Sequence, residues 1–190
     1  MVNLDGRVWF SGLIGLVALE RLVEMRIARR NAAWARAQGA KEYGAGHYPA
    51  MVALHTALLI SALTEVWVFD PRPVPVLTVI CLGLLAATMA MRYWVIGTLG
   101  HRWNTRVLVL PEGQVIARGP FRFLRHPNYV AVAVEIVALP LVHAAYVTAI
   151  VFSLANAALL TVRIRVEEDA LRSHGDYDRV LAHGRQRSPS

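Results

Sequence analysis

The chain has 190 residues, of which 56% are apolar and 17% are charged, and its mean hydropathy is +0.42. It is too hydrophobic for an ordinary soluble domain, and its length suits a single domain over residues 1–190. The net charge of +7 would suit a nucleic-acid-binding protein, but such a protein does not normally carry apolar runs of membrane-spanning length. We therefore expect a membrane protein that has no nucleic acid among its partners.

The N-terminal half, residues 1–98, contains three apolar segments that can each cross a bilayer, which takes about 20 residues. These segments are 8–25, 49–69 and 74–98. The first lacks a basic start, and acidic residues follow it where a small-residue cleavage site would stand, so we expect no cleaved leader. Three prolines in residues 70–75 predict a stiff turn between the second and third spans.

The C-terminal half, residues 99–190, contains a longer apolar run. Residues 130–162 carry Glu135 and His143 as their only ionisable side chains, and 33 residues are too many for one span. Pro140 lies near the middle, where proline breaks or kinks a helix. We interpret the run as a helical hairpin joined near residues 139–144. A C-terminal helix over residues 167–181 is predicted to follow it.

The loops differ strongly in their content of Arg and Lys. Residues 26–48 carry five, residues 99–127 carry five and the segment from Arg163 onward carries six, whereas the N-terminus and the 70–73 turn carry one each. Five spans place the rich segments on one side, which the positive-inside rule makes cytoplasmic. The predicted fold is therefore an all-α, multi-pass protein of the cell membrane. It has about five transmembrane helices, an outer N-terminus, and a cytoplasmic C-terminus and pocket.

Two polar clusters flank the hairpin and are the best candidates for an active site. The first is the stretch 119–129, which reads GPFRFLRHPNY. Pro127 is expected to begin the fourth span, because proline is favoured at the first helical position, and the free N–H groups of a helix start bind anions. Arg125, His126 and Tyr129 would add charge and hydrogen bonds. An interfacial belt at the lipid headgroups is the alternative interpretation.

The second cluster follows the hairpin. Arg163 and Glu167 are four residues apart and so share one helix face, with Glu168 one step round. They form either a surface ion pair, which contributes little to stability, or a charged pair that faces a pocket open to the bilayer. Because the two clusters lie at opposite ends of one hairpin, we expect them to meet at a single membrane surface.

Other polar residues have two interpretations each. Trp103 and Arg106 follow the third span and are either interfacial anchors or substrate contacts. Glu135 either pairs with a cation inside the bundle or reaches a substrate, and Glu20 or Glu24 is expected to pair with Arg92. No metal site is predicted, because the single cysteine, Cys81, lies in an apolar run.

The stretch 119–129, the apolar hairpin and the pattern Arg163-x-x-x-Glu167-Glu168 together resemble the isoprenylcysteine carboxyl methyltransferase family over about residues 97–181. Shorter N-terminal patterns resemble a bacterial branch of that superfamily; they are residues 29–34, 39–44, 47–49 and 54–56. Members of that branch are often encoded beside type III polyketide synthases and are associated with O-methylation of alkylpyrones and alkylresorcinols.

This resemblance implies an integral-membrane O-methyltransferase that uses S-adenosyl-L-methionine and takes a lipidic substrate from the bilayer. It implies catalytic roles for Arg163 and Glu167. The implied cofactor-binding residues are Arg125, His126, Pro127, Tyr129 and Glu168. Glu135, Trp103 and Arg106 are the candidates for substrate contact. Phe121 departs from the tyrosine that many members carry, so any hydroxyl contact at that position is absent.

The acidity of the substrate separates the remaining alternatives. A prenylcysteine carboxylate is already ionised at neutral pH, whereas a resorcinol hydroxyl has an ordinary pKa near ~10 and needs a base or a positive field. Glu167, His126 or Glu135 could act as that base. The N-terminal resemblance favours a polyketide lipid, with a polyketide synthase as pathway partner, over a prenylcysteine. A membrane reductase and a non-enzymatic lipid-binding protein are more distant alternatives.

Overall fold

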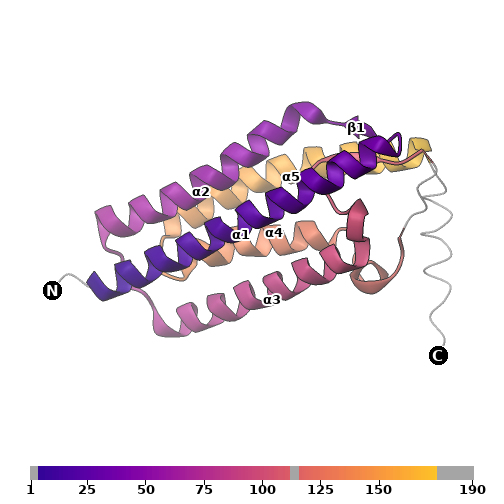
Figure 1. The fold of residues 1–190 in the computed structure, drawn as a ribbon. Helices are drawn as coiled ribbons and strands as arrows, with labels where there is room; N and C mark the ends of the chain where they lie inside the picture. The colour runs from indigo at the N-terminus through magenta and orange to yellow at the C-terminus, as the bar shows by residue number, and fades with distance from the viewer. Residues whose placement is uncertain (1–3, 112–115, 175–190) are drawn as a thin grey trace.

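The computed structural model describes residues 4–111 and 116–174. Five long helices lie side by side along one direction (Figure 1): α1 (Leu4–Ala37), α2 (Tyr48–Phe69), α3 (Pro75–Leu99), α4 (Pro127–Leu141) and α5 (Tyr146–His174). Three single-turn 3₁₀-helices occur at 45–47, 100–102 and 119–122. Two short strands, β1 (Lys41–Tyr43) and β2 (Val107–Val109), pair antiparallel with Glu42 opposite Leu108. The predicted all-α class is confirmed, and this small ribbon is an addition to it.

Three helical stretches are long and apolar enough to cross a membrane: Ala45–Phe69, Pro75–Arg102 and Tyr146–Ser173. The fourth helix is apolar but has 15 residues, and α1 carries charged residues at its middle. Large apolar side chains point outward along the bundle, as a surface against lipid requires. The chain is therefore an all-α membrane protein, and the count of five spans remains a prediction.

Proline and left-handed residues mark the helix boundaries. Pro49, Pro75 and Pro127 stand in the first turns of α2, α3 and α4, where the missing N–H costs no helical hydrogen bond. Gly39, with φ +80°, follows α1, and the N–H of Ala40 bonds the carbonyl of Ala35 at 3.0 Å. Such a glycine supplies the left-handed conformation that closes a helix.

The hairpin between α4 and α5 turns at residues 142–145. Pro140 lies in the last turn of α4, and the N–H of Ala145 bonds its carbonyl at 3.0 Å. This confirms the predicted joint near residues 139–144. The sequence predicts a separate C-terminal helix from residue 167, but α5 continues unbroken through this position to His174. The rest of the predicted helix lies outside the described residues.

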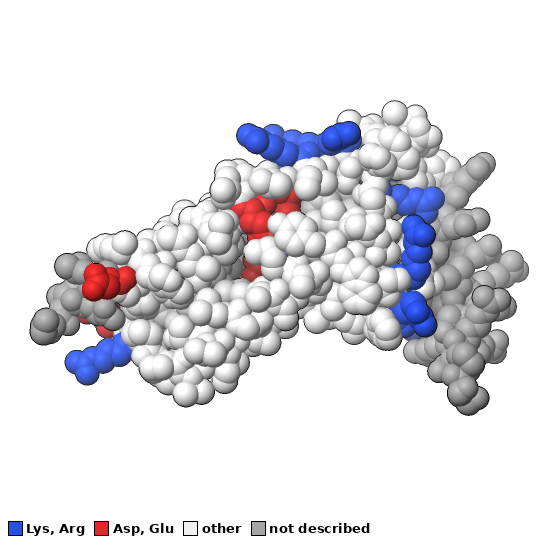
Figure 2. Space-filling view, turned by 60° about the horizontal axis from the view of Figure 1, so that its bottom comes forward, with Lys and Arg blue, Asp and Glu red and all other residues white. Residues whose placement is uncertain are grey.

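The two ends of the bundle differ. One end, here called the loop end, holds residues 38–47, 100–111, 116–126 and 164–174; the opposite turn end holds residues 70–74 and 142–145. Phe10, Ile14, Val66 and Leu139 belong to the main apolar core, which draws on α1, α2 and α4. Figure 2 shows basic side chains gathered toward the loop end and acidic atoms visible in a hollow of an otherwise uncharged face.

Five ionisable residues meet at mid-length between α1, α3 and α4. Arg21 pairs with Glu20 at 3.2 Å, with Glu135 at 2.6 Å and also with Glu24. Arg92 pairs with Glu24 at 3.2 Å and also with Glu135. The predicted pairing of Glu24 with Arg92 is confirmed. Each charge has an opposite partner, which keeps the cluster stable inside a bundle that excludes water.

The start of α5 is capped by a side chain from another helix. The first N–H groups of a helix have no partner within it, and a bilayer offers none. The carboxylate of Glu65 on α2 accepts hydrogen bonds from the N–H of Val147 at 3.0 Å and from the N–H and hydroxyl of Thr148, both at 2.7 Å. Glu65 therefore ties α2 to α5 at the turn end.

We expect Glu65→Ala to lower the free energy of unfolding by about 1–2 kcal/mol, because it leaves two helix-start N–H groups without an acceptor. Glu65→Gln should cost less, since its amide oxygen still accepts. The measurement is thermal unfolding in detergent, followed by far-UV circular dichroism. Thr64→Ala, which removes an exposed hydroxyl bonded within its own helix, is the matched control. Equal stability of Glu65→Ala and Thr64→Ala would contradict the capping role.

The ribbon is held by Glu42, which pairs with Arg106 at 2.5 Å and Arg36 at 2.8 Å. Burial raises the pKa of Glu42, but the hydrogen bonds and charges of these arginines outweigh it and leave the pKa below the ordinary 4.5. A lowered pKa stabilises the fold above pH 4.5, and this contribution is lost as pH falls through the folded value.

The melting temperature of Glu42→Gln should therefore fall less than that of the native chain when pH is lowered from neutral through this window. Above the window, Glu42→Gln should be the less stable of the two. Melting curves in detergent at a series of pH values provide the test. Parallel loss in both proteins would show that Glu42 does not contribute in the way its pairing predicts.

Candidate active site

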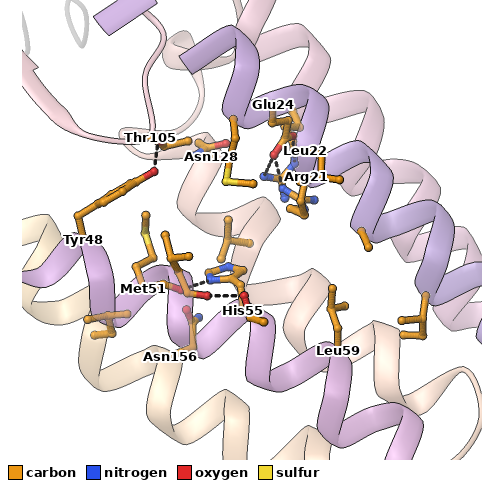
Figure 3. Close-up of a pocket in the computed structure, with 18 of the residues that line it drawn as sticks. Arg21, Leu22, Glu24, Tyr48, Met51, His55, Leu59, Thr105, Asn128 and Asn156 are labelled. Carbon is orange, nitrogen blue, oxygen red and sulfur yellow. Dashed lines mark hydrogen bonds and ion pairs between the residues drawn. The ribbon is translucent and has the colours of Figure 1, made fainter. Parts of the chain in front are cut away.

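A long cavity of about 550 Å³ lies between α1, α2, the start of α4 and α5. This volume falls within the range of pockets that bind small molecules, which is roughly 300–1,000 Å³. Toward the turn end its walls are apolar; they include Ile14, Ala18, Leu59, Ile60 and Leu63. Polar side chains enter it from mid-length to the loop end, and Figure 3 shows several of them. The cavity therefore suits a molecule with a long apolar part and a polar head.

A second cavity of about 130 Å³ lies at the loop end, between residues 99–109, the start of α4 and the last part of α5. Its walls carry both signs of charge: Arg102, Arg106 and Arg125 are basic, and Glu167 is acidic. Phe121 and Leu171 add apolar surface. Such walls suit a ligand that is itself both charged and partly apolar.

Four residues line both cavities: Trp103, Asn128, Tyr129 and Arg163, here called the shared wall. Three of them carry a buried polar atom with no hydrogen-bond partner in the described part of the chain: Trp103 Nε1, Asn128 Oδ1 and Arg163 Nη1. Buried polar groups are nearly always paired in folded proteins, so unpaired ones call for an explanation. Their position where two cavities meet makes this wall suited to a polar group of a ligand.

Arg163 is the central side chain of this wall. It is 4% exposed; its Nε donates to the Tyr129 hydroxyl at 2.9 Å and its Nη2 to the carbonyl of Thr105 at 2.6 Å. No carboxylate among the described residues pairs with it directly. A buried cation without an anionic partner is costly, so the site favours an anion or a developing negative charge next to Nη1.

Tyr129 joins Arg163 to Glu167. Its hydroxyl donates to Glu167 Oε2 while it accepts from Arg163 Nε. The four-residue spacing had suggested a direct contact between Arg163 and Glu167, and a tyrosine from α4 stands between them instead. The interpretation of Arg163 and Glu167 as a surface ion pair is therefore wrong, because Arg163 is buried.

Glu168 holds the neighbouring histidine. His126 Nε2 lies 3.1 Å from Glu168 Oε1, and the His126 ring stacks on Tyr129 with centroids 5.4 Å apart. Arg172 pairs with the other carboxylate oxygen of Glu168 at 3.1 Å. The two predicted clusters, 119–129 and 163–168, therefore meet at one end of the bundle, as the sequence predicts.

Trp103 is positioned by asparagines that cross-link α1 to the loop after α3. Asn31 Nδ2 donates to the carbonyls of Trp103 at 2.7 Å and Gly100 at 3.2 Å. Asn104 Nδ2 donates back to the carbonyl of Ala28 at 3.0 Å. Trp103 is 2% exposed, so its interpretation as an interfacial anchor is wrong.

The remaining predicted site residues differ in whether they line a cavity. Arg125, His126, Pro127, Tyr129 and Glu167 line the smaller cavity. Arg106 also lines it, but its guanidinium pairs with Glu42 and lies 4.1 Å from the centre of the Tyr48 ring. Glu135 lines neither cavity and is held by Arg21 and Arg92, which favours structural pairing over substrate contact.

Sequence reasoning missed several residues of the site: Asn31, Tyr48, Thr105, Asn128 and Asn156. Asn156 carried the clearest signal, because a carboxamide within an apolar helix needs a partner there. Asn128 lies between Pro127 and Tyr129, two predicted site residues, and this position was a signal that it belongs to the site. Thr105 contributes its backbone carbonyl, and any residue type at this position would offer the same group.

Comparison with known proteins gives a consistent result. Residues 79–173 match the model of the isoprenylcysteine carboxyl methyltransferase (ICMT) family. The uncharacterized protein YpbQ of Bacillus subtilis is 38% identical over 165 residues, which cover 85% of this chain and 96% of that protein. An uncharacterized protein of Haemophilus influenzae is 30% identical over 156 residues, which cover 80% of this chain and 88% of that protein.

No solved structure gives a significant match to the chain. The matched region 79–173 covers most of α3, all of α4 and most of α5, together with the shared wall and the residues that line the smaller cavity. The match and the geometry therefore fall on the same part of the molecule. The chain belongs to the isoprenylcysteine carboxyl methyltransferase family, a family of membrane methyltransferases.

Proposed function

We propose that the protein is an S-adenosyl-L-methionine-dependent O-methyltransferase whose substrate is the hydroxyl of an alkylpyrone- or alkylresorcinol-type polyketide lipid. The observation that carries this proposal is the shared wall. There a buried arginine with a free N–H stands between a long, mostly apolar cavity and a smaller charged one. A polyketide synthase would then be the pathway partner that supplies the lipid.

The residues around the smaller cavity fit the chemistry of the cofactor. Arg125 and His126 can receive its carboxylate, Glu167 can face its positive charges, and Phe121 can pack against its base. At about 130 Å³ the cavity is smaller than most ligand pockets, so its described walls would enclose only part of a molecule of that size. When bound, S-adenosyl-L-methionine supplies an activated methyl group and a sulfur leaving group.

The chain contributes alignment and charge. Holding two reactants in line lowers the barrier by about 7–11 kcal/mol. Arg163 Nη1 and Trp103 Nε1 can donate to the substrate oxygen at the shared wall and stabilise negative charge on it. Because the wall is buried, these hydrogen bonds act without competition from water.

A hydroxyl substrate must also lose its proton. Tyr129 offers a route, because its hydroxyl can take a proton from the substrate oxygen while passing its own to Glu167 Oε2. Glu167 is then the final acceptor, and Arg163 holds the Tyr129 oxygen in place. His126, which is engaged by Glu168, orients the tyrosine ring by stacking.

Carboxyl methylation of a prenylated cysteine is the second candidate. It is favoured by the absence of a carboxylate partner for Arg163 among the described residues, since a substrate carboxylate would complete that ion pair. This reaction needs no proton acceptor, so the bridge from Tyr129 to Glu167 would then serve only to position Arg163.

The orientation in the membrane is part of the proposal. Of the 20 Arg and Lys residues, 16 fall in residues 26–48, 99–127 and from Arg163 onward, which supports a cytoplasmic loop end and C-terminus, an outer N-terminus and five spans. The small cavity would then face the compartment that holds the cofactor.

We expect Arg163→Ala to lower kcat by about 100-fold or more, the loss that follows removal of one donor to a developing oxyanion. Transfer of labelled methyl to an alkylresorcinol, an alkylpyrone and N-acetyl-farnesylcysteine in lipid provides the measurement. Arg165→Ala is the matched control, because Arg165 is an exposed arginine on the same helix. Label in the polyketide lipids supports the proposal, label in the prenylcysteine alone supports the second candidate, and full activity of Arg163→Ala would refute the site.

Tyr129→Phe separates the two candidates by mechanism. The variant keeps the ring but breaks the link between Arg163 and Glu167. If Tyr129 relays a proton, kcat should fall by about 100-fold for a hydroxyl lipid and far less for a carboxylate lipid. The melting temperature should fall somewhat, because Arg163 Nε and Glu167 Oε2 lose their partner, and binding of S-adenosyl-L-methionine checks that the site is folded. Equal losses on both lipids would show a positioning role alone.

A further inference from the structure

Two polar side chains of the long cavity take no part in the chemistry described above. His55 on α2 and Asn156 on α5 line the cavity from different helices. Figure 3 shows them at the same part of it, with Arg21 and Glu24 on the α1 side. Both lie farther from the loop end than the shared wall.

The tautomer of His55 follows from its hydrogen bond. Its Nδ1 lies 2.8 Å from the carbonyl oxygen of Met51, and a carbonyl can only accept, so Nδ1 carries the hydrogen. In the neutral ring Nε2 is then an acceptor. No hydrogen bond to this atom is found within the described part of the chain. His55 therefore presents an unused acceptor at the cavity.

Asn156 is 3% exposed and lines the same cavity. Its carboxamide, which can donate two hydrogen bonds and accept others, forms none with the residues that the structure describes. Burying an amide without a partner is unfavourable. A polar group on a ligand would recover that cost.

The other polar residues at this depth already have partners. Arg21, Glu24 and Arg92 belong to the ion-paired cluster, and the Thr56 hydroxyl bonds the carbonyl of Val52 at 2.9 Å. Glu24 Oε1 and Arg92 Nε form no hydrogen bond but are an ion pair at 3.2 Å, so among these residues the groups left for a neutral ligand group are on His55 and Asn156.

The helices set the distance between this pair and the shared wall. His55 is seven residues beyond Tyr48, and Asn156 is seven residues before Arg163, which is about two turns or ~10 Å on each helix. Side chains tilt toward the N-terminus of their helix. His55 therefore leans toward the loop end, whereas Asn156 and Arg163 both lean toward the turn end and keep their spacing of ~10 Å, which is the scale of one substituted ring with a hydrogen bond at each side. Beyond it the walls become apolar, with Leu59 and Leu63.

We propose that His55 and Asn156 form a second polar binding site, which holds a second oxygen of the substrate head while the first is methylated at the shared wall. The preferred ligand is a lipid whose head carries a further hydroxyl, which donates to His55 Nε2 and accepts from the Asn156 amide. The apolar tail lies beyond them. This inference rests on the proposed methyl transfer and specifies which lipids it selects.

The test compares two lipids that differ by one hydroxyl: pentadecylresorcinol, and pentadecylphenol with its single hydroxyl meta to the chain. The native protein should prefer the resorcinol by about 10-fold or more in kcat/KM, because a site built to bind a hydroxyl rejects the analogue that lacks it. His55→Ala and Asn156→Leu should reduce this preference to about twofold by raising KM for the resorcinol, with little change for the phenol. His55→Gln, which places a carboxamide near the position of Nε2, should keep part of the preference.

Calorimetric binding of each lipid, without cofactor, provides a readout independent of turnover and should show the same order. Thr161→Ala is the control, since it removes an exposed hydroxyl that bonds within α5 and lines neither cavity. Melting temperature and cofactor binding confirm that each variant is folded.

Equal use and equal binding of the two lipids by the native protein would overturn the second site and leave the proposed methyl transfer standing. So would an unchanged preference in folded His55→Ala and Asn156→Leu. Methyl transfer to N-acetyl-farnesylcysteine alone would also overturn it, because the isoprenoid would then lie against His55. Failure of methyl transfer to every lipid would contradict the proposed function itself.

Discussion

A bilayer offers no hydrogen bonds, so each polar group inside the bundle must find its partner within the protein or on a ligand. Most of the structure satisfies this constraint. Glu65 accepts the N–H groups that begin α5, and the charges of Arg21 and Arg92 are matched by three glutamates. Among the described residues, Trp103, Asn128 and Arg163 carry buried polar atoms without a hydrogen-bond partner where the two cavities meet. His143, which packs against the Phe10 ring at the turn end, also carries such atoms, as do Glu20, Glu24 and Arg92 of the ion-paired cluster.

The shared wall depends on contacts that arrive from every part of the chain. Arg163 comes from α5, Tyr129 from the first turn of α4, and Trp103 from a loop that Asn31 fastens to α1. Glu42 and Arg106 fasten the same loop to the α1–α2 connection through the β ribbon. A disturbance of any of these links would move a donor at the wall, and a reaction that depends on alignment is sensitive to shifts of about 1 Å.

The sequence predicts the helices well because their signals are local. Apolar runs, three prolines at helix starts and Pro140 near the hairpin joint place most boundaries within a few residues. The pairing of Glu24 with Arg92 was also accessible, since buried charges must pair. What escaped prediction depends on tertiary contact. The ribbon is too short for a periodic signal, the Tyr129 bridge between Arg163 and Glu167 requires two helices to meet, and the burial of Trp103 requires Asn31. Spacing alone placed Arg163 and Glu167 on one face, but it could not show what lies between them.

The two halves of the chain divide the work of the proposed enzyme. The family match begins at residue 79, so it includes the residues proposed for catalysis and cofactor binding but excludes α1 and α2. Those two helices supply most of the apolar wall of the long cavity, from Ser11 on α1 to Leu63 on α2. His55 lies on α2 and Asn156 on α5, so the second polar site spans the boundary between the halves. A change of lipid therefore requires substitutions mainly in α1 and α2, while Arg163, Tyr129 and Glu167 can remain unchanged. This separation follows from the proposed geometry, in which the reacting oxygen lies at the shared wall whatever tail occupies the cavity behind it.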